Sequence, residues 1–165
     1  TRIPYAGRLA GAARRAGGSV GHAVAQRRED GKGSNTNARL FHGILKTPVR
    51  LLPGSEATEV IDEIGTDPAD IVLTRLHGLG PMGGTDMDYV LRNLGVTTIV
   101  GIGVSLNVGM LDFAFDAVNA GYQMVIPRDA VAGIPEDYAE AVLDNTLALV
   151  ATLTTTDAVL DAWSG

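Results

Sequence analysis

The segment "VTTIVGIGVSLNVGML", residues 96–111, constrains the fold more than any other part of the chain. Its first nine residues form a continuous apolar run, which is typical of a strand buried on both faces of a parallel sheet. The residues that follow favour a helix from Asn107 to Ala120. The inner face of that helix would carry Val108, Leu111, Phe115 and Val118. The segment therefore predicts a buried strand, a tight turn and a helix.

The same alternation runs along the whole chain. Apolar or alternating runs predict strands at residues 19–26, 70–76, 96–104 and 122–130. Helical patterns, capping residues and glycine stops predict helices at residues 5–18, 38–46, 55–65, 85–95, 107–120, 136–150 and 154–163. This order favours a single α/β domain with three α/β/α layers and a mostly parallel, Rossmann-like sheet. Ligands of such sheets bind at the carboxyl ends of the strands, which lie near Gln26, Arg75 to His77, Val104 to Asn107, and Arg128 to Asp129.

Composition limits the partners and the chemistry. Of 165 residues, 45% are hydrophobic and 19% are charged, so the chain can bury a sizeable core, and its net charge of −6 argues against a nucleic-acid surface. No residue is cysteine, and the three histidines lack metal-ligand spacing, so we expect neither a metal nor a cofactor. No apolar run has membrane-spanning length and no signal peptide opens the chain, so we expect no membrane partner and a cytoplasmic location.

Two glycine-containing turns nearly match known motifs. "GLGPMGGT", residues 78–85, fits a phosphate-binding loop except that Gly84 stands at the lysine position, which favours a pocket wall over nucleotide binding. "GVSLN", residues 103–107, resembles a nucleophile elbow, but a serine hydrolase of that fold needs a histidine later in the chain. All three histidines precede Ser105, so we expect the side chain of Ser105 or Asn107 to cap the following helix.

Several other polar residues have both a structural and a functional interpretation. Asp112, Asp116 and Asn119 share one helix face, where a solvated or subunit-facing surface is favoured over acid and base work. His22 lies within a strand and is expected to be a satisfied, half-buried histidine. His77 and Arg75, at a strand end, are candidates to line a site, whereas for Arg75, Arg128 and Asp129 a salt bridge competes with ligand contact.

Residues 83–133, "GGTDMDYVLRNLGVTTIVGIGVSLNVGMLDFAFDAVNAGYQMVIPRDAVAG", resemble the isochorismatase-like hydrolase superfamily, which includes the cysteine hydrolases related to nicotinamidase and N-carbamoylsarcosine amidase. The resemblance extends from Arg8 to Trp163. It is strongest from Gly84 to Ala130, where the family pattern runs G-T-x-L, L-R, G-V, G-V-x-x-N-x-C, D-A, G-Y and D-A. The resemblance implies the fold of this superfamily.

The resemblance also implies a site without its usual nucleophile. The family's amidases use a cysteine, a lysine that ends one strand and an aspartate that ends the first strand. Gly109 stands at the cysteine position and has no side chain to act as a nucleophile. The lysine position falls on Leu76, or on Arg75 if the loop holds one extra residue, and arginine stays protonated.

The aspartate and its strand do not occur in these 165 residues. That strand lies in the middle of the family's sheet, so we expect residues 1–165 to be a single domain that lacks its first strand, with roughly 30 more residues upstream. True isochorismatases resemble this turn, with glycine at the cysteine position, because they protonate a vinyl ether and need no acyl intermediate. Such an enzyme would still require the acid of the missing strand.

The turn retains a geometric role in this interpretation. In the family, the peptide before the residue that matches Ser105 is often cis, and backbone N–H groups near the cysteine position hold an oxyanion. Val104, Ser105, Asn107 and Gly109 would supply this backbone frame, which suits a carboxylate or carbonyl oxygen. Arg75 and His77 are the candidate catalytic side chains.

The polar loop after the first predicted strand collects candidate substrate-binding residues: Arg27, Asn35, Asn37 and Arg39. A lid or inter-subunit clamp and a plain solvated loop are both open interpretations. The sequence predicts a hydrolase-family protein that acts on or binds a small molecule without cysteine-dependent amidase chemistry. The alternative is a catalytically inactive ligand-binding or oligomer-forming protein of the same fold. The resemblance implies a homo-oligomer, either a dimer or a tetramer.

Overall fold

The computed structural model describes residues 2–164. The helices are α1 (Ile3–Arg15), α2 (Arg39–Ile44), α3 (Met87–Asn93), α4 (Leu111–Asn119), α5 (Glu136–Asn145) and α6 (Thr156–Trp163). The strands are β1 (Gly21–Ala25), β2 (Ile71–Arg75), β3 (Thr98–Val100), β4 (Gly103–Val104), β5 (Gln123–Pro127), β6 (Val131–Ala132) and β7 (Thr152–Thr154). Short helical turns η1 (Glu56–Thr58), η2 (Leu106–Met110), η3 (Arg128–Ala130) and η4 (Leu147–Leu149) complete the chain. No helix among these is long and apolar enough to cross a membrane.

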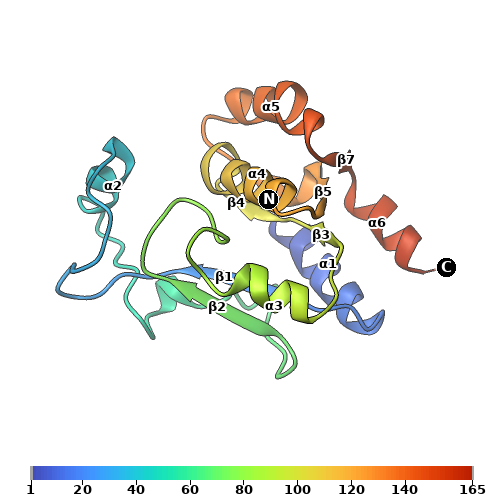
Figure 1. Cartoon of the computed structure of the whole chain (residues 1–165), viewed down its shortest axis with the longest axis horizontal. Coiled ribbons are helices and arrows are strands. Elements are labelled where there is room, and N and C mark those ends of the chain that lie inside the picture. The colour runs from blue at the N-terminus through green and yellow to red at the C-terminus, as the bar shows by residue number, and fades with distance from the viewer. Residues whose placement is uncertain (1, 165) are drawn as a thin grey trace.

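All strand pairs are parallel, as the alternation of strands and helices predicts. Within the described residues the strands form three groups, β1–β2, β3–β5–β7 and β4–β6. The α/β class and the parallel pairing are therefore confirmed. Figure 1 shows the arrangement, with α5 above β3 and β5 and α1 below them.

The side chains of β5 alternate between two helical layers. Met124 and Ile126 belong to the larger core cluster, together with residues of α4 and α5. Val125 packs instead against the smaller cluster of Leu9 from α1 and Val159 from α6. Because successive side chains of a strand point to opposite faces, this division places one helical layer on each face of the strands. The predicted three-layer architecture follows directly from it.

The long apolar run at residues 96–104 is two short strands and not one. β3 ends at Val100 and pairs with β5, whereas β4 begins at Gly103 and pairs with β6. A Cβ atom at Gly101 would collide with the methyl groups of Met124 and Met110, and Gly103 has a φ of +119°, which L side chains rarely adopt. These glycines let the chain leave one partner strand and join another at the carboxyl edge.

Two further predicted boundaries are wrong. The expected helix at residues 55–65 is only the single turn η1. The hydroxyl of Ser55 donates to the carbonyl of Leu52 and does not cap a helix, and Thr58 bonds to the carbonyls of Leu52 and Ser55. These local side-chain bonds compete with helix formation. The strand β7 is the second difference, because the sequence predicts one helix that ends at residue 150 and another that begins at residue 154.

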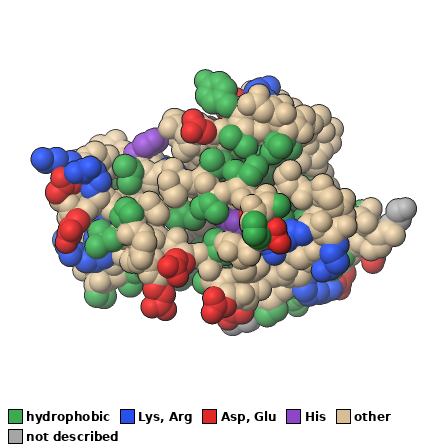
Figure 2. All heavy atoms as spheres, turned by 90° about the horizontal axis from the view of Figure 1, so that it is seen from below, with side chains coloured by type: hydrophobic (Ala, Val, Ile, Leu, Met, Phe, Trp, Pro, Cys, Tyr) green, Lys and Arg blue, Asp and Glu red, His purple; other side chains and the backbone are tan. Residues whose placement is uncertain are grey.

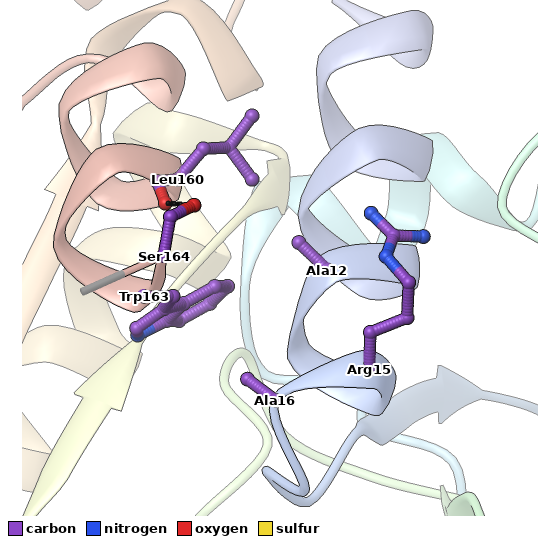
Figure 3. A pocket seen from close by; sticks show the side chains of 6 residues that line it. All are labelled: Ala12, Arg15, Ala16, Leu160, Trp163 and Ser164. Carbon is purple, nitrogen blue, oxygen red and sulfur yellow. Dashed lines mark hydrogen bonds between the residues drawn. The ribbon is translucent and has the colours of Figure 1, made fainter.

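The helices α1 and α6 lie side by side on one face and enclose a small cavity near their ends (Figure 3). Its volume is about 350 Å³, and its lining is Ala12, Arg15, Ala16, Leu160, Trp163 and Ser164. Helices that cross over between parallel strands run back toward the strands' amino ends, so this cavity lies opposite the edge where ligands of such folds bind.

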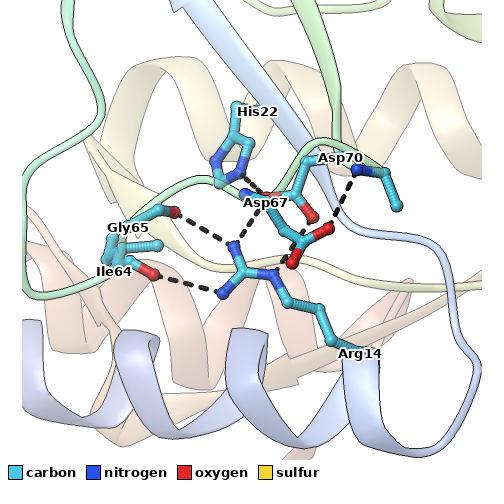
Figure 4. A network of polar contacts seen from close by, with 7 residues as sticks. Arg14, His22, Ile64, Gly65, Asp67 and Asp70 are labelled. Carbon is cyan, nitrogen blue, oxygen red and sulfur yellow. Dashed lines mark hydrogen bonds and ion pairs between the residues drawn. The ribbon is translucent and has the colours of Figure 1, made fainter.

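At the amino ends of β1 and β2 a buried ion cluster ties α1 to the sheet (Figure 4). Arg14 donates through Nε and Nη2 to the two carboxylate oxygens of Asp70, at 3.1 and 2.6 Å, and through Nη2 to the carbonyl of Gly65 at 3.0 Å. His22 Nε2 lies 2.8 Å from the same carboxylate. Hydrogen bonding from Arg14 and His22 holds the pKa of Asp70 well below its usual range despite burial. The expectation that His22 is a satisfied, half-buried histidine is confirmed.

Charged and apolar side chains are unevenly distributed on the surface. Figure 2 shows basic and acidic side chains together at its left end, the end that holds α2 in Figure 1, and further basic side chains at its lower right. Apolar side chains reach the surface across the middle of the same face. Neither feature belongs to the core.

Candidate functional site

Arg75 ends β2 and turns its guanidinium into the glycine-rich loop at residues 78–84. Its Nη1 donates to the carbonyls of His77 and Gly78, at 3.1 and 3.0 Å, and its Nη2 donates to the carbonyl of Leu79 at 3.1 Å. The next residue, Leu76, is exposed. Of the two positions that the resemblance left open for the family's lysine, Arg75 is therefore the one whose side chain faces the loop.

The positive charge of Arg75 has no directly paired carboxylate among the ion pairs of residues 2–164. Burial lowers the pKa of Arg75, and the nearby negative charge of Asp112 opposes this shift. Its Nε atom is buried without a hydrogen-bond partner, as is the hydroxyl of Ser34. Buried polar atoms are almost always paired, so the Nε of Arg75 retains the capacity to donate a further hydrogen bond.

The glycine-rich loop packs against two carboxylates of α4. A Cβ atom at Gly80 would overlap the carboxyl group of Asp112, with the carboxyl carbon only 3.0 Å away. A Cβ atom at Gly83 would lie 3.5 Å from a carboxylate oxygen of Asp116. Only glycine at position 80 permits the close approach of Asp112. The aspartates of α4 thus form one wall of the site.

The two aspartates are half-buried and Asn119 is exposed. The expectation of a solvated or subunit-facing helix face stays a prediction for these residues. Burial raises the pKa of Asp116, the charge of Asp112 raises it further, and a hydrogen bond from the backbone of Gly83 opposes both effects. A carboxyl group with a raised pKa beside a second carboxylate is a candidate proton donor. The spacing of four residues was the sequence signal for this pair.

The turn between β4 and α4 has the backbone geometry that the resemblance implies. The peptide bond between Val104 and Ser105 is cis. Ser105 stands at the start of η2, but neither predicted cap forms, because the Ser105 hydroxyl donates to the side-chain oxygen of Asn107 at 2.9 Å. Asn107 Nδ2 donates in turn to the carbonyl of Ile134 at 3.2 Å. Asn107 therefore ties this turn to the segment that precedes α5.

Gly109 lies in η2 and faces the glycine-rich loop. A Cβ atom built on it would lie 3.3 Å from the carbonyl oxygen of Leu79, which Arg75 also contacts. Gly109, for which the resemblance predicts the family's cysteine position, therefore sits next to the loop that Arg75 contacts. A Cβ atom at position 109 would require the carbonyl of Leu79 to move by a few tenths of an ångström.

The remaining predicted residues are divided between the site and other roles. His77 is exposed, with Nε2 3.4 Å from the carbonyl of Gly84, at the outer end of the loop. Asn35 accepts from the backbone N–H of Gly78 at 2.8 Å and donates to Asn37. Arg39 begins α2, and neither its side chain nor that of Arg27 has a hydrogen-bond partner within residues 2–164.

Arg128 and Asp129 have structural partners. Arg128 pairs with Asp144 and Glu140, and Asp129 accepts from the backbone and hydroxyl of buried Thr156 at the start of α6. In the part of the chain that the structure describes, no three acidic or histidine side chains gather where they could hold a metal ion.

The sequence and the fold both match known proteins. A model of the Isochorismatase domain matches residues 1–158. The chain is 35% identical over 85 residues to the isochorismatase family protein YwoC of Bacillus subtilis (strain 168), an alignment that covers 52% of this chain and 44% of YwoC. This chain thus spans about half the length of the curated relatives it matches.

Two solved structures have the same fold. An isochorismatase family protein from Burkholderia thailandensis superposes with a TM-score of 0.85 at 26% identity, covering 99% of this chain and 83% of that one. One from Desulfovibrio vulgaris superposes with a TM-score of 0.86 at 24% identity, covering 99% and 85%. With the domain match over nearly the whole length, this chain belongs to the isochorismatase family.

Proposed function

We propose that this isochorismatase-family protein binds a small molecule through a carboxylate or carbonyl oxygen, and that it does not use cysteine-dependent amidase chemistry. The observation that carries the proposal is Gly109, which lies beside the carbonyl of Leu79 in an otherwise intact turn. The chain contains no cysteine that could replace it. The ligand's oxygen would lie between this turn and the loop held by Arg75.

Electrostatics supports an anionic or strongly polarised oxygen as the bound group. The Arg75 guanidinium is half-buried and has only neutral carbonyl partners. An arginine in this setting stabilises negative charge but does not shuttle protons. Any hydrolysis at this site would need water as the nucleophile and a carboxylic acid as the proton donor. Asp116, whose pKa is raised by burial, is the described residue best suited to that role.

The second candidate is a ligand-binding protein without catalysis. It is favoured by the same guanidinium, because all three of its hydrogen bonds brace the loop and none is directed to a reacting group. The two candidates share the binding site and differ only in turnover.

A direct test installs the missing nucleophile. In the variant Gly109→Cys, we expect alkylating reagents to modify the single thiol. We also expect the thiol to attack the carbonyl carbon of nicotinamide or of an N-carbamoyl compound, forming a C–S bond as the C–N bond breaks and ammonia leaves with the thiol proton; intact mass detects both adducts. Gly109→Ala, which adds the same Cβ atom without sulfur, is the matched control and should form no adduct. If the folded Gly109→Cys variant gives neither alkylation nor adduct, the turn is not an acyl-binding frame. Amide hydrolysis by the unsubstituted chain, which has no cysteine, would instead favour water as the nucleophile and a carboxylic acid as the proton donor.

Binding is tested separately by calorimetric titration of small carboxylates and amides. Arg75→Gln should abolish binding of carboxylates, whereas Arg15→Gln, at an exposed arginine on the opposite edge, should not affect it. Equal affinities of the two variants would exclude Arg75 as the anion contact.

A further inference from the structure

Gly109, Asp112 and Asp116 lie on one face of η2 and α4, and the glycine-rich loop covers that face. Residues three and four apart on a helix share a face, and each turn advances about 5.4 Å along the axis. A Cβ atom at Gly109 would lie 3.3 Å from the carbonyl oxygen of Leu79. The carboxyl group of Asp112 packs against the next loop residue, Gly80. The carboxylate of Asp112 therefore lies about one turn beyond Gly109 along the same stretch of loop.

The two aspartates have no cationic partner. Neither Asp112 nor Asp116 forms an ion pair within residues 2–164, and both residues are half-buried. Burial and, next, the charge of Asp112 raise the pKa of Asp116, which indicates that negative charge along this face is only partly balanced. A partly desolvated carboxylate attracts a cation more strongly than an exposed one does. This face therefore favours a positively charged group on the ligand.

The guanidinium of Arg75 independently favours a ligand group of the opposite charge. Its Nη2 donates to the carbonyl of Leu79 at 3.1 Å, and its buried Nε has no hydrogen-bond partner. The charge of Asp112 opposes the lowering of the Arg75 pKa that burial causes, but no ion pair joins the two side chains. A cation and a carboxylate thus contact neighbouring residues of one loop, each without a directly paired opposite charge.

We propose that the ligand is a small zwitterion, an amino acid whose carboxylate contacts Arg75 and whose protonated amine contacts Asp112. This inference rests on the proposed function, because it adds a second charged group to the carboxylate that binds at Arg75. The amine is carried by the second or third carbon beyond the carboxyl group, since about one helical turn separates Gly109 from Asp112. One carboxylate is sufficient for the amine, so Asp116 remains free to act as the proton donor.

The charges of such a ligand match those of the site. Arg75 contributes one positive charge, and Asp112 contributes one negative charge. A zwitterion pairs both without adding net charge, whereas a simple carboxylate leaves Asp112 unpaired and places a second negative charge near it. Hydrogen bonds between ionised groups are stronger than neutral ones, so the amine should increase affinity.

Calorimetric titration at neutral pH tests this with ligand pairs that differ only in the amine. We expect β-alanine to bind roughly tenfold or more tightly than propionate, and γ-aminobutyrate likewise more tightly than butyrate. Asp112→Asn should remove this difference and retain carboxylate binding, while Asp86→Asn, at an exposed aspartate, should leave the difference unchanged. Malonamate, which carries a neutral amide in place of the amine of β-alanine, should bind no better than propionate.

The outcomes separate the two proposals. If none of these ligands binds, the proposed carboxylate site at Arg75 is wrong, and the zwitterion is wrong with it. If propionate and β-alanine bind equally, the carboxylate site stands and only the zwitterion is overturned. Equal binding of malonamate and β-alanine would show that the site recognises an N–H group without its charge, which also overturns the inference.

The pKa of Asp116 locates the amine independently of affinity. A positive charge on Asp112 offsets one of the two causes, burial and the charge of Asp112, that raise the pKa of Asp116. Saturating β-alanine should therefore lower this pKa, measured by carbon-detected NMR titration, and saturating propionate should not. In Asp112→Asn, β-alanine should have no such effect. If β-alanine binds to the unsubstituted chain but leaves the pKa of Asp116 unchanged, the amine does not contact Asp112.

Discussion

Two arginines at opposite ends of the β1–β2 pair have contrasting surroundings. At the amino end, Arg14 contacts both oxygens of Asp70, whose side chain is only 2% exposed and which also contacts His22. At the carboxyl end, Arg75 contacts only backbone carbonyls, and its buried Nε has no partner. The first cluster pairs its charges, whereas Arg75 forms no ion pair within residues 2–164 and has one guanidinium nitrogen, Nε, without a partner.

This difference indicates that the Asp70 cluster stabilises the fold, whereas Arg75 is available to bind a ligand. A buried carboxylate that has lost its water must keep its partners, so the Asp70 cluster is expected to be sensitive to any change. An arginine without a carboxylate retains the capacity to accept an anion from outside. The amino edge is therefore interpreted as structural, and the carboxyl edge as the place where a ligand completes the charge balance.

The largest expected effect comes from breaking the amino-edge cluster. Asp70→Asn removes the charge that Arg14 and His22 contact and leaves a partly buried guanidinium unpaired. We expect the free energy of unfolding, measured by urea denaturation, to fall by about 3–5 kcal/mol. The matched control is Asp157→Asn in the exposed pair with Arg8, which should lose less than about 1 kcal/mol. Equal losses would remove the distinction between the two kinds of pair.

The same cluster predicts the direction of acid sensitivity. The pKa of Asp70 is lower in the folded chain than its value of about 3.9 in an unfolded one. Its stabilising contribution is therefore fully present above about pH 4 and is lost as the pH falls toward the folded-state pKa. Below pH 4 the stability of Asp70→Asn should decline less steeply than that of the unsubstituted chain.

The second effect tests the close contact at the carboxyl edge. Gly80→Ala places a Cβ atom on the carboxyl group of Asp112, and we expect it to cost about 1–3 kcal/mol, as overpacking does. Gly83→Ala is the matched control, because its Cβ atom would be in ordinary contact, 3.5 Å from Asp116, and should cost less than about 0.5 kcal/mol. Thermal unfolding of both variants distinguishes a packed wall from a flexible loop.

The sequence predicts the layers of this fold well because they depend on periodicity. The alternation at Met124, Val125 and Ile126 determines which helices cover each face, and the alternation is visible in the sequence. Boundaries are less predictable, since the run at residues 96–104 is divided between two partner strands, β5 and β6, that lie later in the chain. The absence of a helix at residues 55–65 likewise depends on hydrogen bonds from the hydroxyls of Ser55 and Thr58 to nearby carbonyls. The hydrophobic periodicity of the sequence does not predict these bonds.

The family resemblance predicted the cis bond before Ser105, which the structure has. The roles of Arg75 and Gly109 in a site stay predictions. The inward orientation of Asp112 and Asp116 was not predicted, because spacing on a helix face does not say which neighbour covers that face. Likewise, the unsatisfied hydroxyl of Ser34 can only be found from three-dimensional contacts.

A smaller effect tests the link between the polar loop after β1 and the site. Asn35→Ala removes the acceptor of the Gly78 N–H and should lower the free energy of unfolding by about 1 kcal/mol. Asn35→Asp keeps an acceptor oxygen and should retain most of that stability. Hydrogen exchange of the Gly78 amide provides the local measurement: faster exchange in Asn35→Ala alone supports the contact, and unchanged exchange in both contradicts it.

The smallest expected effect is a change in the pKa of Asp116, one of the two aspartates of α4 that face the glycine-rich loop. Asp112→Asn removes a negative charge beside Asp116, so the pKa of Asp116 should fall toward its ordinary value, while burial keeps part of the upward shift. Carbon-detected NMR titration of the Asp116 carboxyl measures this change directly, and Asp86→Asn, at an exposed aspartate in the loop before α3, serves as the control. Because the raised pKa disfavours the charged form in the folded chain, Asp112→Asn should also add stability at neutral pH and little below the folded-state pKa. An unchanged pKa of Asp116 would show that burial alone sets it, and that the carboxyl edge does not hold a coupled acid pair.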